Sequence, residues 1–423
     1  MVLTLTFALL LADHMSRQVV AALFPQLRAE WALTDTQLGA LAGVVPLVVS
    51  VLAVPLSLAS DRWGRVRAIV LMGLVWSLAT VGAALTTGHG ELLATRLLTG
   101  VGEAAYGSVG LAVVLAVFPP DRRAALTGAF LAGASLGAVI GVAAGGAIAV
   151  RFGWRWSFAA IGVLGLVLVA AYRLLISDDR VSRFRDSAPD PERTEVPGAS
   201  RAPLVTLVSP PAVVGAYLGS GLQFFVAGAL IAWLPSWLDR VYHLAPNRAA
   251  GVAAVVLLVM GAGMIGCGAV SDRSARSRPV RQWTTGITWS AASLALLGAA
   301  FSRGPGPVQL LLVLAGAFFV AGTAGPAGAV VADLTPESVR ATALGVLALA
   351  NNLLGLAAGS FVTGVLADRL GLDGAMRVVP LVSVAAIAVL LVGRHAYRAG
   401  AVEGRGTARP GGRRDRRRSV QRS

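Results

Sequence analysis

Charged residues are scarce in this 423-residue chain, making up 13% of it, whereas hydrophobic residues make up 56%. Soluble domains carry about 25% charged residues, so water cannot solvate a surface of this composition. The shortage of charge excludes a soluble globular protein and indicates that lipid covers most of the surface.

Cysteine and histidine are also rare, with one cysteine and four histidines. The lone Cys267 cannot form an intramolecular disulfide, and we interpret it as a small buried residue because it lies in an apolar run. No Cys/His spacing indicates a metal site, and we find no phosphate-binding glycine loop and no nucleophile elbow. We therefore expect no metal, no cofactor and no enzyme activity.

Long apolar runs are abundant. A bilayer core takes about 20 mostly apolar residues per helix. Windows of that length fall at 2–23, 37–58, 68–87, 92–117, 124–149, 156–176, 212–237, 248–270, 281–301, 308–332, 340–366 and 375–396. The sequence therefore predicts an all-α membrane protein with twelve transmembrane helices. The predicted domains are an N-terminal six-helix bundle at 1–176, a cytoplasmic linker at 177–210, a C-terminal six-helix bundle at 211–397 and a disordered basic tail at 398–423.

Arginine placement predicts the orientation. All 36 basic residues are arginine, and 26 of them lie in the tail and in the loops after spans 2, 4, 6, 8 and 10. Excess arginine marks the cytoplasmic side, so we expect both termini inside a plasma membrane. We expect the tail to contact anionic lipid and no nucleic acid, because it has no folded platform and only one aromatic residue, Tyr397. The protein is expected to be a monomer.

One helix-end pattern occurs four times, each time at the end of an apolar run. The copies read Ser57-x-x-x-Asp61-Arg62-x-Gly64, Gly146-x-x-x-Val150-Arg151-x-Gly153, Gly268-x-x-x-Asp272-Arg273 and Gly364-x-x-x-Asp368-Arg369-x-Gly371. They follow spans 2, 5, 8 and 11 and so alternate between the two sides of the membrane. A three-helix unit repeated in alternating orientation produces this arrangement, which is the 3+3 inverted repeat of many transporters. The alternative is that Asp-Arg-Gly merely ends apolar helices, which would suit each copy alone.

The first copy, Asp61-Arg62-Trp63-Gly64-Arg65-Val66-Arg67, resembles the motif between spans 2 and 3 of the major facilitator superfamily. The chain departs from that motif at Ser57, where the family has glycine, and the third copy has Ala275 in place of the later glycine. The resemblance implies transport by alternating access and a conformational latch at the motif. The latch residues would be Asp61, Arg62, Gly64, Arg65, Asp272 and Arg273. The alternative is a helix stop combined with an orientation signal.

Span 4 resembles a narrower branch of that superfamily. The stretch Arg96-Leu97-Leu98-Thr99-Gly100-Val101-Gly102-Glu103-Ala104-Ala105-Tyr106 is similar to the Arg-x-Leu-x-Gly-x-Gly-Glu-Ala-Ser-Tyr of Spinster-like proteins. Span 1 departs from the branch, which has Asn-Tyr-x-Asp-Arg where this chain has Asp13-His14-Met15-Ser16-Arg17. The branch resemblance implies a lysolipid or similar amphiphile as substrate.

Charged residues inside the predicted spans are candidate functional groups, because a charge in the bilayer centre is costly and rarely without function. Asp13 and Glu103 lie near the middle of spans 1 and 4, and Arg17 lies one turn after Asp13, where the two can pair. We expect Asp13 or Glu103 to carry a coupling proton and Arg17 to serve as counter-ion or substrate anchor. The alternative is a structural ion pair between spans 1 and 4. Arg96 ranks below Arg17, because it can snorkel to the outer interface.

In the superfamily, spans 1, 4, 7 and 10 line a central cavity. The resemblance therefore adds four neutral residues of spans 7 and 10 to the substrate-binding candidates, namely Tyr217, Gln223, Trp233 and Thr323. A cavity that is charged on one wall and polar-aromatic on the other suits an amphiphilic or weakly charged substrate. Span 5 has glycines at four-residue spacing, which lie on one face of a helix; we call them the glycine ladder. We expect a neighbouring helix to pack closely on this face, at Gly137, Gly141, Gly145 and Gly146.

The sequence thus predicts a secondary transporter of a small molecule, coupled to protons and surrounded by lipid. Two alternatives lie within transport, multidrug export and organic-anion import. A third belongs to another class, a membrane sensor that kept the fold but does not transport. The intramembrane charges favour transport over the sensor.

Overall fold

The computed structural model describes residues 2–117, 123–176, 207, 210–275 and 280–407, which are almost entirely helical and contain no strand. The N-terminal half contains α1 (Val2–Trp31), α2 (Asp35–Trp63), α3 (Arg65–Ala83), α4 (His89–Glu103), α5 (Tyr106–Val117), α6 (Arg123–Phe152) and α7 (Trp154–Leu175). The C-terminal half contains α9 (Pro211–Tyr242), α10 (Pro246–Ala275), α11 (Arg281–Phe301), α12 (Pro307–Val320), α13 (Ala324–Leu334), α14 (Glu337–Ala350), the π-helix η4 (Asn351–Ala357), α15 (Ala358–Val378), the 3-10 helix η5 (Val379–Leu381) and α16 (Val382–Thr407).

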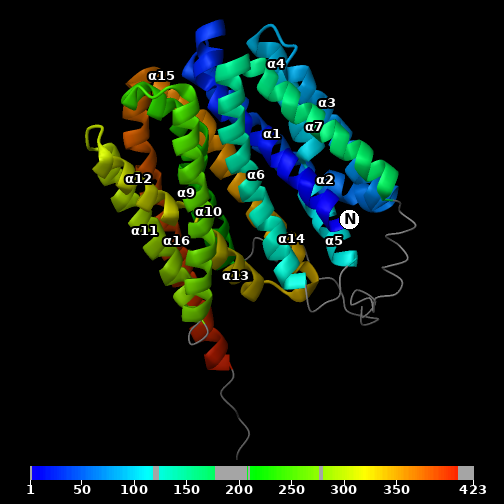
Figure 1. Ribbon diagram of the computed structural model, residues 1–423. Helices are drawn as coiled ribbons and strands as arrows, with labels where there is room; N and C mark the ends of the chain where they lie inside the picture. Colours follow the sequence, from blue (N-terminus) through cyan, green and yellow to red (C-terminus); the bar gives the residue numbers. More distant parts are fainter. Residues whose placement is uncertain (1, 118–122, 177–206, 208–209, 276–279, 408–423) are drawn as a thin grey trace, which may run out of the picture.

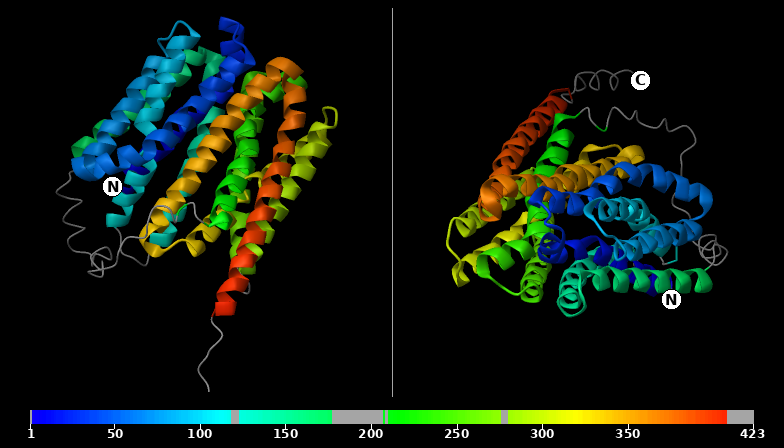
Figure 2. Two further views of the ribbon diagram at one scale, coloured as in Figure 1. Left: turned by 180° about the vertical axis from the view of Figure 1, so that it is seen from behind. Right: turned by 90° about the horizontal axis from the view of Figure 1, so that it is seen from above.

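The two halves stand side by side, with the blue-to-cyan half beside the green-to-red half in both side views (Figure 1 and Figure 2). Eleven helical stretches of the described chain are long and apolar enough to cross a membrane. The last of them, Glu337–Ala399, is 63 residues long and contains a kink at Gly371, so it joins the two spans predicted at 340–366 and 375–396. The predicted twelve-helix fold in two halves is confirmed.

The repeated helix-end pattern has a repeated geometry. Among the described glycines, those with positive φ are Gly64 at 91°, Gly153 at 92° and Gly371 at 71°, and each closes one copy of the pattern. Glycine adopts this left-handed region without the clash that a Cβ causes, so the chain reverses sharply there. In the third copy the turn region 276–279 lies outside the described residues. The shared turn supports a common origin for the units.

Spans 4 and 10 are each broken into two helices, which the sequence did not predict. Span 4 is interrupted between α4 and α5, and span 10 between α12 and α13. In span 10 the break has a local cause, because Pro326 has no N–H to donate to the carbonyl of Gly322. In span 4 no proline is present, but Gly102 packs so tightly that an added Cβ would lie 2.5 Å from the backbone nitrogen of Trp76. The breaks occupy corresponding places in the two halves.

Two predicted boundaries need comment. Helix α16 continues to Thr407, so the expectation of a disordered tail from 398 is wrong for its first ten residues. The rest of the basic tail, 408–423, lies outside the described residues, as does most of the predicted linker, at 177–206 and 208–209.

The halves meet through helices that carry small residues. Helix α2 packs against η4 and α15, and α6 packs against α10. The glycine ladder lies on α6, where a Cβ added at Gly137 or Gly141 would come within 2.6 Å of α1 backbone. A Cβ added at Gly146 would instead lie 2.4 Å from Ala250 of the other half. Without a hydrophobic driving force between helices in lipid, such close contacts supply the packing.

Candidate functional site

The break in span 4 places two charged side chains of different helices in contact. Glu103 is the last residue of α4, and its Oε2 accepts a hydrogen bond of 2.9 Å from Arg17 Nε on α1. The Glu103 side chain is fully buried, whereas that of Arg17 is 13% exposed. Glu103 Oε1 has no hydrogen-bond partner among the described residues. Arg17 therefore contacts the buried acid Glu103 and is itself partly accessible to solvent.

Asp13 lies near this pair without joining it. Its side chain is 3% exposed, and Oδ2 lies 3.2 Å from Nδ1 of the adjacent His14. Asp13 Oδ1 has no hydrogen-bond partner in the described chain, and no ion pair joins Asp13 to Arg17 there. The expected pairing along α1 is thus replaced by a pairing between α1 and α4.

Arg96 is buried, not snorkelling, with only 1% of its surface exposed. Its guanidinium donates two hydrogen bonds of 2.9 Å to the backbone carbonyls of Ser16 and Arg17. The interpretation of Arg96 as an interfacial residue is therefore wrong. We call Asp13, Arg17, Arg96 and Glu103 the charged cluster; its formal charges of two acids and two arginines cancel. This neutrality makes burial of four ionisable groups tolerable.

A small cavity of about 20 Å³ lies between the halves beside Arg17. Its walls come from α1 and α2 on one side, including Ala42 and Pro46, and from α9, η4 and α15 on the other, including Gly228 and Ser360. The volume suffices for about one water molecule. Arg17 is the only charged residue in this lining, so we call this space the Arg17 cavity.

The four neutral candidates of the C-terminal half do not line the Arg17 cavity. Tyr217, Gln223 and Thr323 are buried, and each has side-chain polar atoms without a hydrogen-bond partner in the described chain. Thr323 lines a separate cavity of about 10 Å³ within its own half. Trp233 donates a hydrogen bond of 2.8 Å to the Ser360 carbonyl, so its indole N–H is not free to bind a substrate in this conformation.

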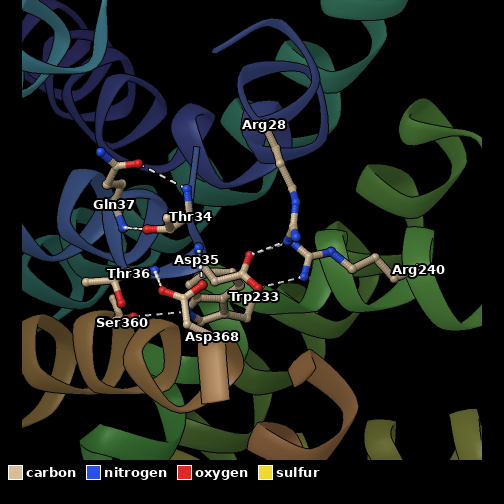
Figure 3. Close-up of polar contacts among 9 residues, drawn as sticks. All are labelled: Arg28, Thr34, Asp35, Thr36, Gln37, Trp233, Arg240, Ser360 and Asp368. Carbon is tan, nitrogen blue, oxygen red and sulfur yellow. Dashed lines mark hydrogen bonds and ion pairs between the residues drawn. The ribbon is translucent and has the colours of Figure 1, made fainter. Parts of the chain in front are cut away.

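At one end of the molecule an ionic gate joins the halves (Figure 3). Asp35 Oδ1 is 2.7 Å from Arg28 Nη1 of its own half and 2.6 Å from Arg240 Nη2 of the other half. Asp368, the acid of the fourth motif copy, accepts hydrogen bonds of 2.8 Å from the backbone nitrogens of Asp35 and Thr36. Its carboxylate thus caps the N-terminus of α2, where negative charge is favourable.

The gate joins the two halves through hydrogen bonds and ion pairs at this end of the molecule. We use "the gate" for Arg28, Asp35, Arg240 and Asp368. None of these four residues is among the site residues predicted from the sequence. The available signal was the acid of the fourth motif copy, but the convergence of Arg28 and Arg240 on one carboxylate depends on packing between distant segments.

Comparison with known families shows to which family the chain belongs. A model of the Major Facilitator Superfamily matches residues 6–305. The chain belongs to the Major Facilitator Superfamily.

Individual members of the Major Facilitator Superfamily are similar to this chain over most of its length. The hexuronate transporter of Bacillus subtilis (strain 168) is 24% identical over 364 residues, covering 85% of this chain and 86% of the relative. Protein spinster homolog 1 of Homo sapiens is 27% identical over 387 residues, covering 85% of this chain and 71% of the relative. These relatives confirm a membrane transporter with a likeness to Spinster proteins, and they are not enzymes.

A solved structure of a bacterial homolog of the human lysosomal transporter Spinster, in an inward-facing and unoccupied conformation, has the same fold. Its TM-score is 0.85 at 19% sequence identity, covering 94% of this chain and 97% of that one. At this identity the likeness establishes the fold alone.

The superfamily latch motif lies at the end opposite the gate. Gly64 makes the expected turn, and Arg62, Asp272 and Arg273 are exposed, with no ion pair for Asp272 or Arg273 in the described chain. The side chain of Asp61 lies outside what the structure describes, and Arg65 is half-buried. The latch role stays a prediction.

Proposed function

We propose that this protein is a proton-coupled transporter of an organic anion that has an apolar portion. The observation that carries the proposal is Arg17, the one charged residue lining the Arg17 cavity, hydrogen-bonded to the buried Glu103. A single cation among neutral side chains attracts a carboxylate or phosphate. At about 20 Å³ the cavity is too small for such an anion in this closed conformation, so the substrate would bind once the halves move apart. The surrounding Ala, Pro, Ile and Leu side chains would then face its apolar portion.

The Arg17–Glu103 contact supports a mechanism for coupling. While Glu103 is ionised, its negative charge offsets that of Arg17 and weakens the attraction of a second anion. When Glu103 is ionised, it holds Arg17; when it takes up a proton, Arg17 becomes available to the substrate anion. Proton and anion therefore load together, which is symport. Asp13 is the second candidate proton carrier, because it is buried in the same cluster.

The names of several relatives agree with an anionic substrate. Among them are the hexuronate transporter, a probable 4-methylmuconolactone transporter of Cupriavidus pinatubonensis (strain JMP 134 / LMG 1197) and a probable L-galactonate transporter of Escherichia coli (strain K12). Hexuronate and galactonate are sugar carboxylates. The Spinster-like resemblance of this chain, which implies a lysolipid-like amphiphile, agrees with a substrate that has an apolar portion.

The membrane placement belongs to the same proposal. We place both termini on the cytoplasmic side of the plasma membrane, on the arginine distribution, and the protein as a monomer with anionic lipid at its basic tail. The gate then lies on the outer side, and the conformation described here is closed outward. The proposed domains are the two six-helix bundles with the cytoplasmic linker between them.

Purified protein in liposomes with an imposed pH gradient tests the function. Sugar acids and single-chain alkyl carboxylates are offered as substrates, and accumulation is measured with the gradient present and collapsed. We expect gradient-driven accumulation in the native protein. The Glu103→Gln protein should exchange the anion across the membrane but no longer accumulate it.

The matched control is Glu91→Gln, because Glu91 is an exposed acid at the start of the same helix, far from the charged cluster. Accumulation by Glu103→Gln equal to that of the native protein would refute the coupling role. Binding without any flux, in every substrate class, would instead indicate a sensor.

A further inference from the structure

A larger cavity, of about 380 Å³, lies on the seam between the halves but apart from the charged cluster. One wall comes from α2 and α4, including Ala40, Leu47 and Leu93, and the opposite wall from η4 and α15, including Ala358 and Phe361. We call it the seam cavity. Its walls belong to different halves, so it keeps this shape only while the halves are joined at the gate end.

The seam cavity and the Arg17 cavity lie on opposite sides of one thin wall. Ala42 and Pro46 of α2 line the Arg17 cavity, whereas Ala40 and Leu47 of the same helix line the seam cavity. The helices α2 and η4 pack closely at Gly43, where an added Cβ would lie 2.8 Å from the Ala357 carbonyl oxygen. The seam cavity is therefore a site of its own.

Every side chain lining the seam cavity is apolar. At its mouth Leu47 is 42% exposed and Phe361 is 43% exposed. The mouth continues into the lipid-facing surface of the same helices, where Val51 of α2 and Leu97 of α4 are also exposed. Enclosed apolar cavities take up apolar molecules, and the seam cavity has the same kind of lining although it is open at its mouth. Because these helices span the bilayer, the molecule at the mouth is the hydrocarbon of a lipid.

An exposed arginine lies toward the gate end on the helix that lines the seam cavity, where the neighbouring acid Asp368 is engaged in capping α2. Arg369 lies eleven residues after Ala358 on α15, which on an ideal helix is three turns along and within roughly 20° of the same face. It is exposed and has no ion pair in the described chain. His89 lies one turn before Leu93 on α4, with its ring nitrogen 3.3 Å from the Gln37 carbonyl. A lipid phosphate would find a cation at this end.

We propose that the seam cavity binds one acyl chain of an anionic membrane phospholipid, with the phosphate toward Arg369. Since the cavity exists when the gate is closed, the bound lipid favours the closed gate by mass action on that conformation. The inference is independent of what the protein transports. It gives the bilayer composition a direct effect on the conformational equilibrium.

Photolabelling tests the site directly. The full chain is placed in nanodiscs containing a phosphatidylglycerol with a diazirine near the end of one acyl chain, and labelled peptides are mapped by mass spectrometry. We expect strong labelling of the seam cavity helices α2 and α15. Ala358→Phe and Ala40→Phe each fill the cavity and should remove that labelling.

The matched control is Ala291→Phe, an equally bulky change at an exposed position of α11, which is absent from the lining. It should leave labelling of the seam unchanged. Labelling of the seam that survives both filling variants would overturn the proposal, as would labelling no stronger than on the exposed face of α11. If one filling variant does not fold, the other still decides.

A distance measurement tests whether lipid binding in the seam cavity favours the closed gate. Spin labels are attached to cysteines placed at Glu91 and Asn247, which are exposed in different halves near the gate, in a Cys267→Ala background. We expect phosphatidylglycerol to increase the short-distance, closed population relative to phosphatidylcholine. Ala358→Phe should abolish the increase, and Arg369→Gln should remove the difference between the two lipids. An increase of equal size in Ala358→Phe contradicts the inference.

Discussion

The break in span 4 and the break in span 10 occupy the same place in the two halves, but different side chains surround them. At the first, the helix ends at Glu103, which is hydrogen-bonded to Arg17. At the second, Thr323 stands just before α13 with its hydroxyl buried and without a partner in the described chain. One scaffold therefore presents an ionic network in one half and isolated neutral groups in the other.

The unequal distribution of charge suggests that the two halves of the symmetric fold have different roles. Interrupted spans at corresponding places are where transporters of this architecture bind substrate and ions. Among the described residues only the N-terminal half has charges at its break, so the proposed proton and anion chemistry would belong to that half. The C-terminal half contributes Arg240 and Asp368 to the gate, which closes over the Arg17 cavity. Each prediction below tests this division.

The largest effect is expected from Arg17→Ala. The change removes the only charge facing the Arg17 cavity and leaves Glu103 as an unpaired buried acid. Breaking a buried ion pair in this way destabilises a protein by about 3–5 kcal/mol. We expect loss of anion transport in liposomes together with a lower melting temperature of the purified protein.

A double variant separates the two consequences of losing Arg17. In Arg17→Ala/Glu103→Gln no charge is left unpaired at this contact, so the melting temperature should recover while anion transport stays absent. Arg303→Ala is the control, because Arg303 is exposed and hydrogen-bonds only within its own half. Transport that returns with stability would show that Arg17 is structural.

Asp35→Asn should have the next largest effect, on conformation more than on binding. Asp35 is 3% exposed and is contacted by arginines of both halves. Hydrogen bonds to charged groups contribute about 1.5–3 kcal/mol each, so losing this charge should favour the open gate roughly tenfold or more. The labels at Glu91 and Asn247 report the change. Asp373→Asn is the matched control, since Asp373 is an acid at the same end that pairs only within its half.

Asp368→Ala should shift the same equilibrium less. The carboxylate caps two backbone nitrogens of α2, and losing a helix cap costs about 0.5–2 kcal/mol. Asp368→Asn should shift the equilibrium less than Asp368→Ala, because its amide oxygen can still accept one of the two hydrogen bonds. At the equivalent place of the second motif copy, Val150 has no carboxylate to lose, so Val150→Ala should change nothing. A shift as large in Val150→Ala would refute the capping role.

The architecture was accessible from the sequence because it depends on local signals. Apolar length predicted the twelve spans, and the motif copies predicted repeated units, three of which share the same backbone turn at Gly64, Gly153 and Gly371. The break in span 4 was not accessible, because Ala104 and Ala105 carry no helix-breaking signal. Its cause includes the tight contact of Gly102 with another helix.

The site was accessible only in part. Charge within the predicted spans identified Asp13, Arg17 and Glu103 as candidates. Helical spacing favoured a pair between Asp13 and Arg17 within α1. The observed hydrogen bond between Arg17 and Glu103 depends on the packing of α1 against α4. Arg96 was predicted to lie at the membrane interface because it is near the end of a span. The structure buries it, and the backbone carbonyls of Ser16 and Arg17 on α1 accept its hydrogen bonds. The gate joins Asp35 to a residue 205 positions away, a contact that no local pattern predicts.

The smallest effect is expected from Thr323→Val, and it tests the C-terminal side of the comparison most directly. Valine has nearly the same shape but no hydroxyl, and the Thr323 hydroxyl is buried without a hydrogen-bond partner in the described chain. Replacing an unpaired buried polar group by an apolar one is close to neutral or stabilising. If Thr323 only packs, the melting temperature should hold or rise slightly, with transport unchanged. If its hydroxyl instead contacts the substrate in another step of the cycle, KM should rise while stability holds. That outcome would extend the substrate site into the C-terminal half and end the strict division between the halves.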